Sequence, residues 1–214
     1  MKCYCIETDE KFIYCVENVE EKYIENIEHA WFKKEGNKYI KEYPNNFSDK
    51  EIIKNNFSNI GESMFKNEGD WGKSLEIFAD KCLNNNIEWY IIGSLSEAVL
   101  GVNIVPHDID IITHVRDFYK TKDIFLEYLI EPFVDNGGSW VVQYFGRICI
   151  DGIMIDIAAD KKMNKENNNY EDVFWKKYDL KIEPITKRYD IEVQRKRIER
   201  MEKIKEYMVK NGIK

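Results

Sequence analysis

Two aspartates lie two residues apart in the otherwise mostly apolar stretch VPHDIDIITH, residues 105–114. Because alternate side chains of a strand share one face, a strand here places Asp108 and Asp110 on the same side, with Cα atoms roughly 7 Å apart. Burial disfavours both charges, and each carboxylate raises the pKa of the other, so one is protonated unless a cation intervenes. The pair therefore indicates a divalent metal site.

A third carboxylate, Asp156, again stands alone among apolar residues in IMIDIAA. The Asp151–Gly152 dipeptide is typical of a two-residue type I′ turn, which predicts a hairpin over residues 139–160. The second strand of that hairpin could lie beside residues 105–112, so that three carboxylates converge. Such hard oxygen ligands suit Mg²⁺, which keeps several waters and completes its shell with substrate phosphates.

The segment IIGSLSEAVLG, residues 91–101, joins a predicted strand to a predicted short helix. Ser94 is expected to be the N-cap, with Glu97 completing a capping box and Gly101 ending the helix. Free backbone amides at the positive end of a helix favour a phosphate. Taken alone, Gly93 followed by Ser94 is more often ordinary helix capping than a binding site.

Together these motifs resemble the polymerase-beta-type nucleotidyltransferase superfamily: Gly-Ser, thirteen residues, Asp-hydrophobic-Asp-hydrophobic, then a later hydrophobic-Asp-hydrophobic. The resemblance covers about residues 73–160. Within it, PHDIDI after LG is most similar to the small-molecule branch that adenylylates aminoglycosides and lincosamides. The resemblance implies an α+β nucleotidyltransferase fold, with a mixed central sheet flanked by helices.

The same resemblance implies roles for the five motif residues. Gly93 and Ser94 would hold a triphosphate, Asp108 and Asp110 would bind a metal pair, and Asp156 would complete the second metal site. The implied cofactor is Mg²⁺, with two ions in the active complex, and the implied co-substrate is a nucleoside triphosphate, with ATP favoured. In such sites the two ions stabilise the attacking and leaving oxygens of an in-line displacement.

The function that follows is transfer of a nucleoside monophosphate, with AMP favoured, to a hydroxyl of a small molecule such as an antibiotic, with release of pyrophosphate. One alternative is transfer to a protein or tRNA, as in toxin–antitoxin members. Another is a silent nucleotide-binding module, which ranks last because all three acids are present. An excess of acids in residues 1–68 would attract a cationic acceptor such as an aminoglycoside, although a solvated surface explains them equally: Glu17, Glu20, Glu21, Glu25 and Glu28.

Arg147 is placed by geometry alone. Counting back from the predicted turn sets it opposite Asp156, where it either contacts phosphate or forms a simple cross-strand ion pair, and the sequence favours neither. His107 and His114 flank the acid pair, and strand ends near solvent explain both better than catalysis does. The basic run QRKRIER, residues 194–200, is typical of a solvated helix face and is a secondary candidate for phosphate contacts.

Composition bounds the remaining function classes. A net charge of −7 over 214 residues argues against a protein that coats nucleic acid. Residues 171–214 nevertheless hold 13 Lys and Arg against 9 Asp and Glu, which could meet a small polyphosphate. No apolar run approaches the roughly 20 residues that a bilayer requires, and the first ten residues carry acids, so neither a membrane nor a secretory signal is expected. Five irregularly spaced cysteines favour reduced thiols and a cytoplasmic location.

Three parts are expected along the chain. Residues 1–68 predict a small N-terminal β-rich domain with two hairpins and a helix at about 48–57. In it, Cys3, Cys5 and Cys15 are better explained by burial than by zinc. Residues 69–162 predict the nucleotidyltransferase core, including a helix over 116–130 that Pro132 ends. Residues 163–214 predict a loop, KENNNYED, and one long C-terminal helix with an apolar stripe.

Overall fold

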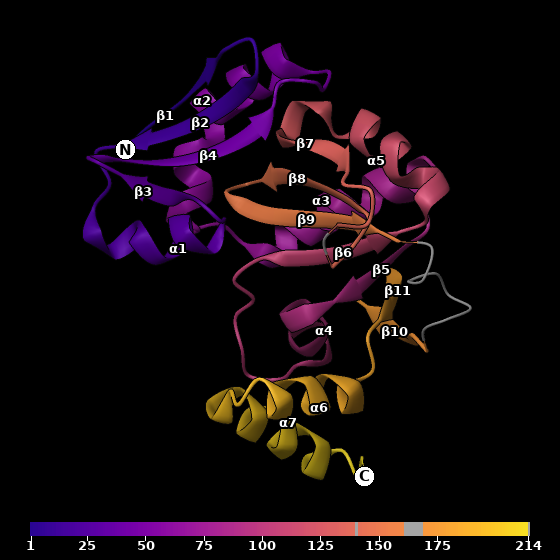
Figure 1. Cartoon of the computed structure of the whole chain (residues 1–214). Helices are drawn as coiled ribbons and strands as arrows, with labels where there is room; N and C mark the ends of the chain where they lie inside the picture. The colour runs from indigo at the N-terminus through magenta and orange to yellow at the C-terminus, as the bar shows by residue number, and fades with distance from the viewer. Residues whose placement is uncertain (140, 161–168, 214) are drawn as a thin grey trace.

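The computed structural model describes residues 1–139, 141–160 and 169–213. The N-terminal part is a four-stranded antiparallel sheet of order β1-β2-β4-β3 (Figure 1). Its two hairpins confirm the prediction for this part of the chain. The strands are β1 (Lys2–Glu7), β2 (Lys11–Glu17), β3 (Lys33–Glu35) and β4 (Lys38–Pro44).

Two further helices complete the N-terminal part. Between the hairpins lie a 3₁₀ turn and the short helix α1 (Ile24–His29), which the sequence pattern did not predict. The helix expected at 48–57 is present as α2 (Lys50–Lys66) and is longer than expected. Buried Phe57 and Phe65 line α2, which contacts strands of both sheets. The N-terminal sheet is therefore packed onto the rest of the molecule.

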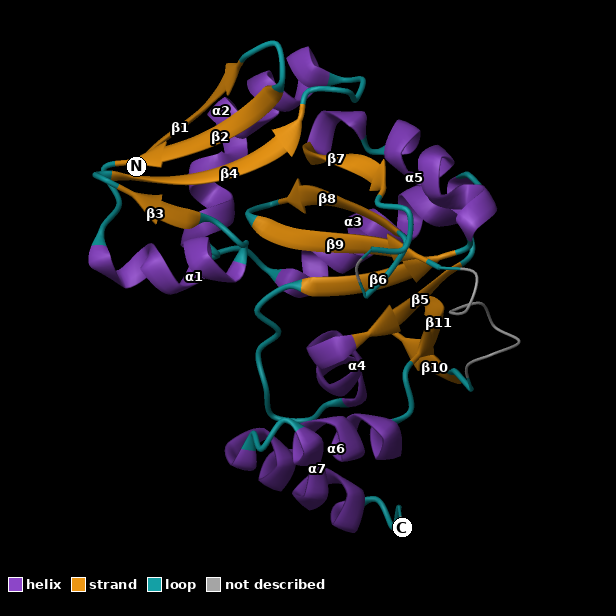
Figure 2. Ribbon diagram, viewed as in Figure 1, coloured by secondary structure: helices purple, strands orange, loops and turns teal. Residues whose placement is uncertain are grey.

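The second sheet is mixed and has seven strands in the order β10-β11-β5-β6-β9-β8-β7 (Figure 2). The pairs β6–β9 and β11–β5 are parallel and the others are antiparallel, which confirms the expected mixed α+β sheet. Its strands are β5 (Trp89–Ile92), β6 (Ile109–Thr113), β7 (Leu129–Asp135), β8 (Tyr144–Ile150), β9 (Ile153–Ala159), β10 (Glu171–Trp175) and β11 (Tyr178–Ile182).

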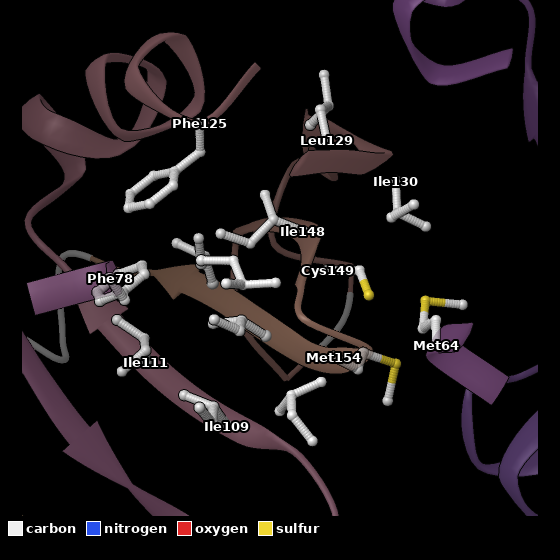
Figure 3. Close-up of a cluster of buried hydrophobic side chains, with 14 of the residues drawn as sticks. Met64, Phe78, Ile109, Ile111, Phe125, Leu129, Ile130, Ile148, Cys149 and Met154 are labelled. Atoms are coloured by element: carbon white, nitrogen blue, oxygen red, sulfur yellow. The ribbon is translucent and has the colours of Figure 1, made fainter. Parts of the chain in front are cut away.

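Figure 3 shows part of the main core, a cluster of buried apolar side chains that includes Phe78 of α3 (Trp71–Asn84). Phe78 of α3 stacks on Phe125, with ring centroids 4.9 Å apart. Ile109 and Ile111 of β6 both enter this buried cluster. Because side chains alternate along a strand, the residue between them, Asp110, points to the opposite face.

The β8–β9 hairpin determines which residues of these two strands face each other around Asp156. Asp151 and Gly152 both have positive φ, +52° and +79°, as a type I′ turn requires. The turn pairs Ile150 with Ile153, and the ladder then sets Arg147 opposite Asp156, as predicted. Burial of all seven residues of β9 makes this register strongly specified.

The helix predicted over residues 116–130 is wrong in its second half. The helical part ends early as α5 (Phe118–Ile124), flanked by 3₁₀ turns, and residues from Leu129 onward form strand β7. Pro132 lies inside β7 instead of ending a helix. It is tolerated because β7 is the edge of the sheet and its pairing with β8 is irregular between Glu131 and Val134.

The C-terminal prediction also needs correction. Strands β10 and β11 extend the core sheet where only a loop was expected, although residues 165–168 of that loop lie outside the described residues. The single long helix is two helices, α6 (Ile185–Gln194) and α7 (Ile198–Lys210). The chain reverses at Lys196, which has a φ of +57°. The division at residues 68 and 162 stays a prediction.

The cysteine arrangement agrees with burial. Cys3 and Cys5 share one face of β1, whereas Cys15 pairs with Tyr4 and so lies on the other face. Burial raises the pKa of Cys3 to about 12, so its thiol is protonated at neutral pH. Among the described helices, none combines the length and apolar character needed to cross a bilayer.

Candidate active site

Three carboxylates converge at one end of β6 and β9. Asp110 is the second residue of β6 and pairs in parallel register with Asp156 of β9. Asp108 lies just before β6, because the strand expected at 105–112 begins only at Ile109. One carboxylate oxygen from each residue lies within 4.8 Å of the others. The sequence motifs were therefore combined correctly, although Asp108 comes from a loop and not from the strand.

The cluster carries more negative charge than its surroundings neutralise. Burial, together with the charges of Asp108 and Asp156, raises the pKa of Asp110 to about 8. Burial also raises the pKa of Asp156 above its usual value, against the opposing charge of Arg147. A divalent cation would remove this conflict. The all-oxygen donor set of these three residues fits magnesium.

Gly93 lies directly against the acid cluster. It has a φ of +68°, and a Cβ added there would be 2.2 Å from Oδ2 of Asp110. Helix α4 (Gly93–Leu100) begins at this residue, with its N-cap position at Ile92. Glycine is therefore required here both by the backbone conformation and by the close approach of a carboxylate.

The expected capping box at the start of α4 is not formed. Ser94 lies inside the helix instead of at its N-cap and is 6% exposed. Glu97 does not reach back to the backbone, because its Oε1 accepts a hydrogen bond of 2.8 Å from Nε of Arg188 in α6. A buried ion pair between α4 and the C-terminal helices thus replaces the predicted local cap. Gly101 ends α4 at a φ of +91°, as predicted.

Substituting Gly93 by Ala is expected to lower thermal stability and to weaken divalent-metal binding, because the new methyl group displaces the Asp110 carboxylate. Gly36→Ala is the matched control: Gly36 has a φ of +62° with no atom within 4 Å of an added Cβ. It should show only the conformational cost of positive φ, on the order of 1 kcal/mol. Calorimetric melting and Mn²⁺ titration of both variants test this. Equal effects of the two substitutions would contradict the close-approach explanation.

Arg147 is directed at Asp156. Its Nε and Nη2 donate to Oδ1 and Oδ2 of Asp156 at 2.5 and 2.8 Å, while Nη1 donates to Glu131 at 2.8 Å and to the Ala30 carbonyl at 3.3 Å. The side chain is fully buried and does not line the cavity described below. These contacts favour the ion-pair interpretation over the phosphate contact. Each Asp156 oxygen retains a lone pair that can bind a metal.

Glu131 extends this ion pair to the N-terminal sheet. Lys41 Nζ and Tyr43 Oη of β4 donate to Glu131 Oε2 at 2.5 and 2.6 Å. Burial acts to raise the pKa of Glu131, but the charges of Arg147 and Lys41 lower it to about 2. The result is a buried network that joins β4, β7, β8 and β9. We call Lys41, Tyr43, Glu131 and Arg147 the Asp156 support network.

A cavity of about 720 Å³ opens in front of the acids. One wall comes from the N-terminal part and the opposite wall from the C-terminal helices. The basic run at residues 194–200 thus contributes to the cavity instead of only to a solvated face. The lining of the cavity includes Glu25, His29, Trp31, Gly93, Ser94, Asp108, Asp110, Asp156, Arg195, Arg197, Arg200 and Lys203.

Of the histidines, His29 contacts the acids. Its Nε2 lies 2.9 Å from Oδ2 of Asp108, and its ring lies 4.5 Å from the ring of His107. The hydrogen bond to Asp108 raises the pKa of His29. His114 instead contacts Glu88 and Tyr90, away from the cavity. No local signal identifies His29, because it is 79 residues from Asp108 along the chain.

The C-terminal helices are attached to α4 through Arg188. Besides Glu97, its guanidinium contacts Glu192 at 2.5 Å and Glu183 at 3.4 Å. Arg200 of α7 lies 3.9 Å from Glu97 in the same cluster. This buried cluster attaches the C-terminal helices to α4, and residues of α4 and α7 line the same cavity.

Neither the scan against family models nor the search of curated proteins finds a match for this chain. A crystal structure of a proposed nucleotidyltransferase from Thermotoga maritima matches with a TM-score of 0.50 at 23% identity, over 65% of this chain and 93% of that one. The chain has the nucleotidyltransferase fold. At this identity the likeness concerns the fold alone. A structure of ANT(2″)-Ia in complex with adenylyl-2″-tobramycin also matches, with a TM-score of 0.45 and 9% identity over 62% of this chain and 86% of that one, too low to support a conclusion.

Proposed function

We propose that the protein is a metal-dependent nucleotidyltransferase, which transfers a nucleoside monophosphate, with AMP favoured, from a nucleoside triphosphate to a hydroxyl of a small acceptor. The observation that carries the proposal is the convergence of Asp108, Asp110 and Asp156 beside the first turn of α4. An antibiotic is one candidate acceptor. The nucleotidyltransferase fold supports the proposal but does not identify the substrates.

The proposed reaction is an in-line displacement at the α-phosphorus of the triphosphate. The acceptor oxygen attacks the α-phosphorus and forms a new P–O bond, while the bond to the β-phosphate bridging oxygen breaks and pyrophosphate leaves with that electron pair. The acceptor hydroxyl releases one proton, which passes to solvent water in the cavity. Magnesium, when bound by Asp108, Asp110 and Asp156, supplies charge neutralisation for the phosphates and activation of the hydroxyl. Arg147 keeps Asp156 oriented, and the first backbone amides of α4 face the phosphates.

The leaving pyrophosphate is assigned to the basic residues that the C-terminal helices contribute to the cavity. Arg197, Arg200 and Lys203 line the cavity together with Gly93 and Ser94. Guanidinium and ammonium groups donate charge-assisted hydrogen bonds that suit phosphate oxygens. The secondary candidate from the sequence, residues 194–200, therefore becomes part of the proposed triphosphate site, with Lys203 added.

Joint substitution of Arg200 and Lys203 by Ala is expected to weaken ATP binding about a hundredfold or more, since each of the two charge-assisted contacts is worth about 1.5–3 kcal/mol. AMP lacks the β- and γ-phosphates, so its affinity should change little. Calorimetric titration of both nucleotides with Mg²⁺ measures the difference. Lys205→Ala, on the same helix but outside the cavity, is the matched control. A parallel loss of ATP and AMP affinity would overturn the phosphate assignment.

Pyrophosphate release tests the proposed reaction. Each nucleoside triphosphate is incubated with Mg²⁺ and the purified protein, alone and with a panel of hydroxyl-bearing acceptors, and transferred nucleotide is identified by mass spectrometry. We expect release that requires both metal and an acceptor, and its loss in Asp156→Asn. Asp172→Asn, an 82% exposed acid on β10, should retain full activity. Full activity in Asp156→Asn would refute the assignment of the acids.

A further inference from the structure

We propose that Trp31 of the N-terminal part is the centre of an acceptor subsite, which takes an apolar or aromatic ring of the molecule that carries the reacting hydroxyl. This inference rests on the proposed function and names the substrate class that its cavity selects. It also gives a role to residues 1–68, for which the sequence alone offers only an excess of acids that a solvated surface explains equally.

The side from which the acceptor enters follows from in-line displacement. The attacking oxygen approaches the α-phosphorus opposite the leaving pyrophosphate. Gly93 and Ser94 of α4 line the cavity, as do the basic residues of α7. The contacts of Glu97 with Arg188 and Arg200 join α4 to α6 and α7. Figure 1 shows α1 on one side of the ends of β6 and β9, and α4, α6 and α7 on the other. With pyrophosphate on the α4–α7 wall, the acceptor oxygen comes from the α1 wall.

Trp31 lies on that wall and also borders a second cavity. It follows α1 by two residues, and His29 at the end of that helix contacts Asp108. The second cavity measures about 360 Å³ and shares Trp31 with the first. An acceptor that packs on Trp31 can therefore occupy the second cavity while its hydroxyl reaches toward the acids. The lining is largely apolar: Trp31, Tyr43, Val134, Asn136 and Phe145.

The backbone and the ring of Trp31 are both held in place. Its φ is +68°, an uncommon conformation for a bulky residue. Its backbone N–H donates a hydrogen bond of 2.9 Å to the backbone carbonyl oxygen of Glu28. Arg147 and Lys41 each lie 4.8 Å from the ring centroid as cation–π partners. Phe145 packs at a centroid distance of 5.3 Å. An indole that is 44% exposed is thus fixed by the Asp156 support network.

The charge of this wall argues for a ring in preference to a polycation. Of the five acids that suggested a cationic acceptor, Glu25 lines the main cavity. Glu17 instead accepts a hydrogen bond from the Tyr4 hydroxyl, and Glu20 forms an ion pair with Lys22. Lys41 and Arg147, which lie against Trp31, are already paired with Glu131 and Asp156. No carboxylate is among the described residues that line the second cavity, so no anionic side chain there would bind an ammonium group. The flat indole face and the apolar walls favour an aromatic or alicyclic ring.

The test uses 5-fluorotryptophan-labelled protein and fluorine NMR, with the Trp31 signal assigned by Trp31→Phe. The probe is benzyl alcohol, which carries an apolar aromatic ring and a hydroxyl, and glucose, whose pyranose ring is polar, is the control. We expect benzyl alcohol to shift the Trp31 signal saturably and to give proton nuclear Overhauser contacts with the Val134 methyl groups. Glucose should produce neither effect. An unchanged Trp31 signal at saturating benzyl alcohol would overturn the subsite.

Two variants locate the binding. Val134→Asp should weaken benzyl alcohol binding at least fivefold, whereas Val209→Asp, a 72% exposed valine on α7, should leave it unchanged. Equal losses would indicate non-specific adsorption and overturn the proposal. ATP with Mg²⁺ is titrated separately: if it shifts Trp31 and competes with benzyl alcohol, the second cavity holds the nucleobase and the acceptor assignment is wrong. Failure of ATP to bind at all would instead refute the proposed function.

Discussion

Arg147→Met is expected to lower the free energy of unfolding by about 3–5 kcal/mol, the usual cost of removing one partner from a buried ion pair. The substitution leaves Asp156 without its two hydrogen bonds and Glu131 without one of its cations. Glu131 is fully buried and cannot be solvated in compensation, and Asp156 reaches solvent only where it lines the cavity. Urea unfolding followed by circular dichroism gives the free energy directly.

The matched control for this variant is Arg116→Met. Arg116 pairs with Asp117, its side chain is 75% exposed, and the change should alter stability by less than about 0.5 kcal/mol. Glu131→Gln should fall between the two, because Lys41 and Arg147 each lose a charged partner but keep a hydrogen-bond acceptor. An Arg147→Met midpoint equal to that of Arg116→Met would contradict a supporting role for Arg147.

Asp110→Asn is expected to lower kcat/KM for nucleotide transfer on the order of a thousandfold, which corresponds to about 4 kcal/mol of lost transition-state stabilisation by bound metal. In the metal-free protein at neutral pH the same change should raise the free energy of unfolding, because burial and the charges of Asp108 and Asp156 force Asp110 to take up a proton on folding, whereas Asn is neutral in both states. Activity and stability thus move in opposite directions. Steady-state kinetics and urea unfolding in EDTA measure the two effects.

This opposition separates loss of a metal ligand from misfolding. A variant that is inactive because it is unfolded would lose stability and activity together. Asp172→Asn removes an exposed carboxylate and should change neither quantity. Retained activity in Asp110→Asn, or reduced stability without metal, would contradict the role given to this residue.

The parts of the site set by local rules could be predicted from sequence. The Asp151–Gly152 turn determines the β8–β9 register by itself, which is why Arg147 was placed opposite Asp156 correctly. The alternation of apolar and acidic residues around Asp110 predicts which side chains of β6 face the core and which face the opposite side of the sheet. The pairing of β6 with β9 joins strands that are distant in the sequence, so no local rule predicts it. It could still be inferred, because isolated acids in two apolar strands are best accommodated when the strands lie side by side and the acids share a cation.

The N-terminal wall could not be predicted, because it depends on contacts between distant segments. His29 reaches Asp108 across 79 positions of the chain. Lys41 donates a hydrogen bond to Glu131, which lies 90 positions away along the chain. Trp31 adopts a positive φ that its residue type disfavours, so no propensity rule indicates it. Such contacts follow only from packing α2 between the two sheets.

Two errors have a common cause, which is a helical spacing of apolar residues that tertiary structure overrides. Residues 129 and 130 fit the spacing of the preceding helix, but sheet pairing recruits them into β7, where edge position accommodates Pro132. The apolar stripe at the C-terminus likewise continues through Lys196, where neither glycine nor proline marks the break. The reversal there turns Arg197 and Arg200 toward the cavity.

The most direct test of the proposed site is calorimetric binding of a non-hydrolysable ATP analogue to wild type and Asp110→Asn, each with Mg²⁺ and with EDTA. If Asp108, Asp110 and Asp156 hold the metal that carries the triphosphate, wild type binds the analogue at least tenfold more tightly with Mg²⁺, and Asp110→Asn loses that difference. Equal affinity with and without Mg²⁺ in wild type, or an intact Mg²⁺ dependence in Asp110→Asn, would contradict it.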